Sequence, residues 1–525
     1  PPPPTETHTQ VNSSAASDVY KRQGLSLEAA ADLAILGGRA NVATLEANYS
    51  GIIGETASEF GFSLDNLDTR DIASQSAAFS WLSTIEAPIS GALRGGVDND
   101  GGLMPLNATL QIGAGVIQPT PAATPIPIDG AHSYFTYTPD TQSLRFDQFD
   151  IDSQWGRGSL EGLATMVTHK SGRLKEMVGQ LRLNKLSVNP ADIYDQPVDI
   201  EAAELDFRLS LEPFSFQLGR VDITDKGHVL TGRGQVAVGE KGWTVAMDGE
   251  LDGIAVDRVK ELWPVSVKPK TRKWIGDNVS AGRITDASAA VRLSQGDVPK
   301  LYLSFDFAEA NARFLKEMPP LENGKGHASL VKDRFVLVID EGRVSAPLGG
   351  EVDVAGTSFI IPDTRAKPDP PAVVRLRADA SVTAALSLLD QPPVSLMQKA
   401  DQPVDIASGA VKVDGTISLP LKKNAPIEEV GFDVAGVVTN ARTDTLVRGR
   451  EMAAERLVLT ASDSEISLSG KGTFDAVPVD MTWKQAIGRP GAILPGRVTA
   501  QAVITPEALD AFGIALPRGM LQGQA

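Results

Sequence analysis

The stretch Gly156-Arg157-Gly158-Ser159-Leu160 lies between two segments in which apolar and polar residues alternate, and similar short phrases return three more times along the chain. The later copies are Gly232-Arg233-Gly234-Gln235-Val236, Leu348-Gly349-Gly350-Glu351-Val352 and Gly470-Lys471-Gly472-Thr473-Phe474. Self-similarity of this kind is typical of repeat proteins, whose units stack in one direction. The pattern predicts an extended surface rather than a single catalytic pocket.

A glycine-rich phrase can also bind phosphate, but that reading needs a helix directly after the glycines. Here the residues after two of the phrases, 235–238 and 351–354, continue as strand patterns. Glycine also permits the backbone angles that turns and bulges need. We therefore interpret Gly158, Gly234, Gly350 and Gly472 as structural glycines that mark turns between strands.

Strand patterns dominate the rest of the chain. Leu205, Phe207 and Leu209 alternate with polar residues, and the same spacing returns in 301–307, 335–339 and 466–468. Alternation with a period of two gives a strand one apolar face and one wet face, which is typical of antiparallel sheets. The 49 Gly and 34 Pro residues punctuate these short segments as turns do.

A helical pattern recurs between the strand patterns. The segments 73–85, 256–263 with an extension over 270–278, 381–389 and 505–512 each have apolar residues three or four apart and a proline nearby. They are too short to be stable alone, so we expect them to brace one face of a sheet.

These patterns together predict a mainly β protein, a long twisted antiparallel sheet curled into an open groove of repeated units with short bracing helices. We expect a non-native or disordered leader over 1–23, because residues 13–23 resemble a translated sequencing adapter. Partial or complete groove units then follow over 24–115, 116–297, 298–420 and 421–525.

Composition favours a protein that is not an enzyme. The net charge of −17 disfavours nucleic acid or an anionic membrane surface as the main partner. The absence of cysteine excludes thiolate metal sites and thiol nucleophiles. The five histidines have no partners at metal-ligand spacing, and no nucleophile motif occurs. We therefore expect neither catalytic residues, nor a metal site, nor a cofactor.

The apolar faces of the predicted strands must either be buried against other parts of the protein or bind a ligand. In a sandwich or a closed barrel two such faces bury each other, whereas an open groove leaves one face available to a ligand. A repeat adhesin built from β-sandwiches would follow the first arrangement, and a lipid carrier the second. A non-enzymatic scaffold for envelope assembly remains a further alternative.

The stretch 249–356 resembles the AsmA-like superfamily, in its YhdP-like branch. The residues that carry the resemblance are Leu262-Trp263-Pro264, Trp274-Ile275, Ala281-Gly282-Arg283-Ile284, Pro319-Pro320-Leu321-Glu322-Asn323-Gly324 and Leu348-Gly349-Gly350-Glu351-Val352. The alternation of these modules extends over most of 24–525. The resemblance implies a bridge-like protein that moves phospholipids between the inner and outer membranes of a Gram-negative envelope.

It also implies a periplasmic location with an inner-membrane anchor, and this chain would then be an internal fragment without that anchor. The expected partners are phospholipid acyl chains and, for the intact protein, both membranes. Alternating apolar residues are the candidates for the groove floor, and a charge at Phe305 or Leu337 is expected to block passage. The candidates are Leu205, Phe207, Leu209, Leu301, Leu303, Phe305, Phe307, Phe335, Leu337, Ile339, Leu457, Leu459, Ile466 and Leu468.

Overall fold

The computed structural model describes residues 7–8, 25–36, 42–75, 77–189, 193–422, 425–426, 429–447, 449–475, 477–487, 496–503, 505 and 509. The chain divides into two compact units, and each is described by itself. The first comprises residues 1–252, 261–268 and 288–300, and the second comprises residues 253–260, 269–287 and 301–525. The expected border at 297/298 lies close to the end of the first unit, whereas those at 115/116 and 420/421 lie inside the units.

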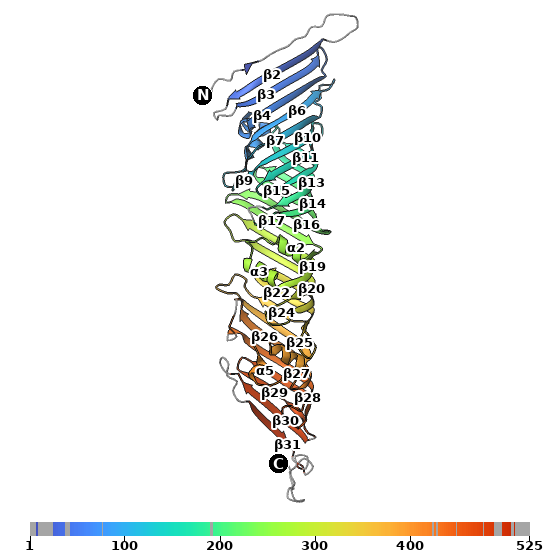
Figure 1. Ribbon diagram of the computed structural model, residues 1–525. Coiled ribbons are helices and arrows are strands. Elements are labelled where there is room, and N and C mark those ends of the chain that lie inside the picture. Colours follow the sequence, from blue (N-terminus) through green and yellow to red (C-terminus); the bar gives the residue numbers. More distant parts are fainter. Residues whose placement is uncertain are drawn as a thin grey trace. The chain divides into compact units, whose positions relative to one another are not determined.

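The protein is mainly β, as the sequence predicts, and every strand pairing with a described register is antiparallel. In the first unit each strand of the main sheet pairs with the next one along the chain (Figure 1). This ladder runs through β1 (Thr7–His8), β2 (Ser26–Leu36), β3 (Val42–Ile52), β4 (Ser58–Asp68), β6 (Pro88–Val97), β7 (Leu106–Ile112), β10 (Gly130–Thr138), β11 (Ser143–Ser153), β12 (Gly156–Thr168), β13 (Leu174–Val188), β14 (Val198–Leu211), β15 (Phe214–Asp225), β16 (His228–Gly239) and β17 (Gly242–Leu251).

The second unit repeats this arrangement. β22 pairs with both β23 and β24, which in turn pair with β25. The strands are β18 (Ile254–Ala255), β20 (Lys300–Ala312), β21 (Leu321–Val331), β22 (Arg334–Ser345), β23 (Glu351–Asp353), β24 (Ser358–Ile361), β25 (Pro371–Ser381), β26 (Ser408–Pro420), β27 (Gly431–Thr443), β28 (Met452–Ser462), β29 (Glu465–Phe474), β30 (Val477–Ala486) and β31 (Arg497–Ala502). β19 (Val279–Ser294) is divided between the units.

Part of the segment expected to be a non-native or disordered leader belongs to the sheet. Thr7–His8 form β1, in which Thr7 pairs with Leu33 of β2. The other residues of 1–23 lie outside the described residues.

The helical predictions are confirmed for three of the four segments. Residues 73–85 overlap α1 (Thr69–Gln75) and the 3₁₀ helix η1 (Ala77–Thr84). Residues 256–278 contain α2 (Val256–Leu262) and α3 (Pro269–Asn278). Residues 381–389 form α4 (Val382–Leu389), whose N-cap Ser381 accepts a hydrogen bond from the Ala384 N–H. The short α5 (Leu396–Lys399) was not predicted. The predicted helix over 505–512 lies outside the described residues, apart from 505 and 509.

The helices are inserted between strands that are neighbours in the sheet. α1 and η1 lie between β4 and β6, which pair directly, and α4 and α5 lie between β25 and β26, which also pair. Their apolar residues pack against the sheet. Leu82 of η1 joins a buried cluster with Ile89 and Ile112, and Ala384 of α4 joins one with Val411 and Val438. In both inserts, therefore, the helix braces the sheet.

The prediction that the four glycines mark turns is wrong for three of them. Gly158, Gly234 and Gly472 lie within β12, β16 and β29, each opposite or beside a register shift in the preceding or following strand. Such bulges occur where one strand carries extra residues. Only Gly350 lies in a turn, with a φ of +97°. The glycines therefore accommodate bulges more often than they reverse the chain.

A charged contact fixes the turn that follows β29. The Arg450 guanidinium donates to the Asp475 carboxylate at 2.6 Å, and the Glu451 N–H donates to its other oxygen at 3.0 Å. These hydrogen bonds hold the pKa of Asp475 below its ordinary value of 3.8. Because the folded state favours the ionised carboxylate, this contact contributes stability above that pH, and the contribution is lost as the pH falls through the lowered pKa.

We therefore expect Asp475→Asn to unfold at a lower urea concentration than the parent at pH 7. The difference should start to shrink below about pH 3.8 and disappear as the pH falls through the lowered pKa of Asp475, because the parent carboxylate then becomes neutral as well. Asparagine tolerates the positive φ of 44° at this position, so the backbone should be retained. Urea titrations at a series of pH values measure the effect, and a difference that is constant with pH would contradict it.

Candidate functional site

One face of the sheet in the first unit is apolar from strand to strand. Residues directly opposite each other in an antiparallel pair point to the same face, so the register identifies which side chains share it. A single row of opposed residues crosses the ladder from β2 to β17. It consists of Ala31, Ala47, Phe62, Leu93, Ala108, Phe135, Phe146, Gly162, Leu181, Leu205, Val221, Gly232 and Gly249. Every member of this row is apolar or glycine.

The second unit has the same property in two overlapping rows. The first row consists of Phe305, Ala328, Leu337, Phe359, Val374 and Ile417. The second consists of Ala378, Val413, Gly436, Leu459, Leu468, Trp483 and Val498. We call this side of each unit's sheet the apolar face and the opposite side the polar face.

All fourteen candidate residues from the sequence lie on the apolar face. Phe207, Ile339 and Leu457 are buried there, Leu301 is exposed, and the others are half-buried. The sequence interpretation missed the part of the face over β2 to β12, where Phe62, Phe135 and Phe146 lie. The signal was present, because Leu106, Ala108, Leu110 and Ile112 of β7 alternate with polar residues.

The apolar face is only partly covered. Leu27, Tyr49 and Phe62 on its β2–β4 portion remain 43%, 40% and 44% exposed. Among the described residues, the strands outside the main ladder are β5 (Ile85–Glu86), β8 (Gly115–Ile117) and β9 (Ile126–Ile128), which form a small separate sheet. The described structure is therefore not a sandwich of two large sheets.

The polar face carries ion pairs across neighbouring strands. Arg182 of β13 binds Glu204 of β14 at 2.7 Å, and Lys412 of β26 binds Asp379 of β25 at 2.6 Å. Hydrogen bonding and charge attraction from Glu204 raise the pKa of Arg182, and Asp379 raises the pKa of Lys412 in the same way. Such exposed pairs add little stability but keep this face wetted. The two faces of the sheet thus differ sharply in chemistry.

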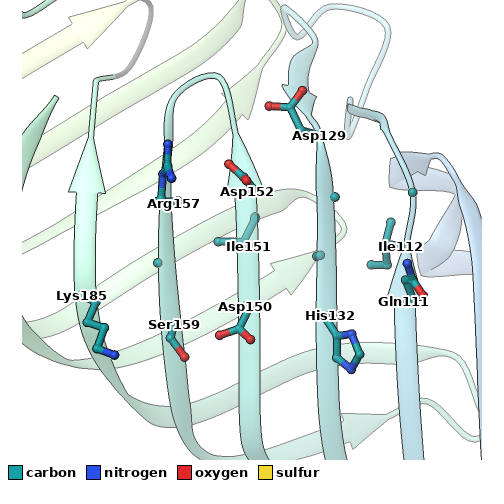
Figure 2. Close-up of a pocket in the computed structure, with 14 residues that line it drawn as sticks. Gln111, Ile112, Asp129, His132, Asp150, Ile151, Asp152, Arg157, Ser159 and Lys185 are labelled. Carbon is teal, nitrogen blue, oxygen red and sulfur yellow. The ribbon is translucent and has the colours of Figure 1, made fainter. Parts of the chain in front are cut away.

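A shallow depression of ≈ 470 Å³ lies over β7 and β10 to β13 (Figure 2). Gln111, His132, Asp150 and Ser159 follow one another across these strands on the polar face, and Lys185 lies beside them. The rings of His132 and Tyr134, on the same strand, lie 4.7 Å apart and are tilted by 42° to each other. Asp150 and Asp152 of β11 and Asp129 line one part of the depression, and Arg157 of β12 and Lys185 of β13 line the neighbouring part. Nowhere in the described part of the chain do three or more His, Cys, Asp or Glu side chains cluster as metal ligands do.

The glycine phrases do not form a ligand loop. Gly158 and Arg157 line the depression, but the chain continues from them as strand β12, without the helix N-terminus that phosphate binding would need. His327 pairs with Asp340 at 3.0 Å on the polar face. Neither feature brings a nucleophile and a base together as a hydrolase requires.

Comparison of the chain with known protein families, with curated proteins and with solved structures gave no match. Within the described residues, no helix is both long enough and apolar enough to cross a membrane.

Proposed function

We propose that this protein carries phospholipids by holding their acyl chains against the apolar face of its sheet. The observation that supports this proposal is the row of apolar residues and glycines that passes from β2 to β17 without a polar interruption. An acyl chain needs a dry surface along its whole path, and one charged side chain would interrupt it. Headgroups would remain in water along the uncovered margin.

In this proposal the chain is part of an AsmA-like envelope protein of the YhdP-like branch. It would act in the periplasm, anchored to the inner membrane in the intact protein, and move phospholipids between the two membranes along a groove formed by the curled sheet. The chemistry needs no catalytic residue, metal or cofactor, because lipid movement along a surface breaks no covalent bond. The alternating charges of the polar face would keep the outer side of the sheet in water.

Mass spectrometry of organic extracts from the purified chain tests this function. We expect co-purified phospholipid in amounts comparable to the protein, because the exposed part of the apolar face is too large to remain bare in a cell that contains lipids. Extracts of an unrelated acidic protein purified in the same way provide the background. A lipid content at that background would contradict the proposal and favour a scaffold that binds no lipid.

The bound lipid should also be located on one side of the sheet. A phospholipid with a photoreactive acyl chain is expected to label peptides at apolar-face positions such as Met166, which lies opposite Met177. Leu163 lies on the polar face of the same strand and is 52% exposed, so it provides an internal control for accessibility. Equal labelling of both positions would indicate adsorption without a defined path.

A further inference from the structure

The helical inserts of the chain do not all brace the sheet. α4 buries Ala384 and Ser387, and η1 buries Leu82, whereas α3 buries none of its residues. Its sequence, Pro-Lys-Thr-Arg-Lys-Trp-Ile-Gly-Asp-Asn, carries three basic residues, while the eight residues of α4 carry no charge. α3 thus lies in an insert between paired strands, as α4 does, but it lacks the apolar composition of a helix that packs on a sheet. The side chains of α3 therefore form part of the protein surface and not of its core.

The residues that follow β20 complete this surface. The Arg313 N–H donates to the carbonyl of Asn278 at the end of α3 at 2.9 Å, and the rings of Trp274 and Phe314 lie 6.1 Å apart. Trp274, Phe314 and Leu315 are 39%, 50% and 46% exposed. We call this surface the basic–aromatic patch. It comprises Lys270, Arg272, Lys273 and Trp274 of α3 together with Arg313, Phe314, Leu315 and Lys316, all within the second unit.

The charge of the patch is opposite to that of the chain. It contains five basic residues in a protein with a net charge of −17. Asp277 pairs with Lys273 at 3.0 Å and Glu317 approaches Lys316 at 3.5 Å, but Lys273 and Lys316 are 77% and 92% exposed. Such exposed pairs are weak and leave their cations available to an external anion. Anionic ligands should therefore be attracted here and repelled by most of the remaining surface.

We propose that the basic–aromatic patch docks this protein on an anionic phospholipid bilayer. Tryptophan prefers the boundary between water and hydrocarbon, and Phe314 and Leu315 are consecutive apolar residues that can enter it. Basic side chains around them attract anionic headgroups. A stable protein partner would need about 800 Å² of complementary surface on each side, whereas a bilayer needs only a few inserted side chains beside several cations. Docking would place the protein next to a source of lipids, which is a role separate from the proposed carriage of lipids along the apolar face.

Flotation of the purified chain with vesicles tests the proposal. We expect the chain to float with phosphatidylcholine vesicles that contain phosphatidylglycerol, and to stay unbound with phosphatidylcholine alone. Lys270→Glu combined with Lys273→Glu should weaken vesicle binding at least about tenfold, as should Phe314→Ser combined with Leu315→Ser. Salt at about 1 M should weaken the binding of the parent, because it screens exposed charges over about 3 Å.

Matched variants separate docking from folding and from lipid carriage. Lys270→Arg combined with Lys273→Arg keeps the charge and should bind as the parent does. Lys332→Glu combined with Lys471→Glu makes the same charge change at exposed positions of the same unit outside the patch, and should bind normally. The proposal would be overturned if the parent protein did not bind anionic vesicles. It would also be overturned if the glutamate variants of the patch bound as strongly as the parent. Co-purified lipid is measured separately, so docking can fail while lipid carriage stands.

Discussion

If the apolar face is the proposed lipid path, aspartate in place of Phe62 or Phe305 is expected to reduce the bound phospholipid and to slow lipid passage by about 30-fold to 100-fold. Both side chains lie in the apolar rows, Phe62 opposite Leu93 and Phe305 opposite Ala328. An acyl chain that crosses such a position would have to cover an unpaired carboxylate, which raises the barrier by roughly 2–3 kcal/mol. Bound lipid per protein, and the transfer of a fluorescent phospholipid between vesicles, measure the two effects.

Leu163→Asp is the matched control for Phe62→Asp. Leu163 is 52% exposed on the polar face and Phe62 is 44% exposed on the apolar face, so both changes place a carboxylate at a partly exposed apolar position of the first unit. We expect the control to retain the lipid content and the transfer rate of the parent. If both variants lose lipid equally, the loss reflects the stability of the sheet and the assignment of the apolar face as the lipid path fails.

Gly349→Ala is expected to destabilise the second unit by about 3 kcal/mol. Gly349 has a φ of +90°, and an added Cβ would overlap Ala384 N and lie 2.9 Å from the carbonyl carbon of Thr383 in α4. The same turn is fastened to the helix, because the Ser381 hydroxyl donates to the Gly349 carbonyl at 2.8 Å and the Leu348 N–H donates to Ser387 Oγ at 3.1 Å. The helix would have to move away from the sheet that it braces.

The neighbouring glycine gives the control for this prediction. Gly350 has a similar φ of +97°, but an added Cβ would meet no atom within 4 Å. Gly350→Ala should therefore cost only the backbone strain, about 1–2 kcal/mol. Urea unfolding of both variants separates the close approach of the helix from the unusual backbone angle. Equal losses for the two variants would show that the contact with α4 contributes nothing.

The sequence predicted which residues share the apolar face better than it predicted where the turns and bulges between strands lie. Alternation within a strand is a local property, so Leu205, Phe207 and Leu209 were assigned to one face before any strand partner was known. Which residues lie opposite one another depends on pairing between strands, and the bulge opposite Gly158 is visible only once β12 and β13 are paired. The glycines were therefore interpreted as turns, because glycine favours turns and bulges for the same conformational reason.

The basic–aromatic patch could not be recognised from the sequence either. Trp274 was noted as part of a family resemblance, and Phe314 was not singled out. The two residues are forty positions apart, and they become neighbours because residues 313–318 return to the end of α3. The α3 pattern also satisfied the expectation of a bracing helix, since apolar spacing alone does not tell which face of a helix is covered. The comparison with α4 shows that no residue of this helix is fully buried.

Each strand of the ladder pairs with the strands next to it along the chain. The length of the apolar face is therefore proportional to the number of strands. Each added strand extends a sheet by about 4.8 Å. Removing or duplicating one hairpin, such as β13 with β14, keeps the flanking strands antiparallel and returns the apolar residues to the same side. A sheet built in this way can be lengthened or shortened by whole hairpins in steps of about 10 Å, without changing the strands at its ends.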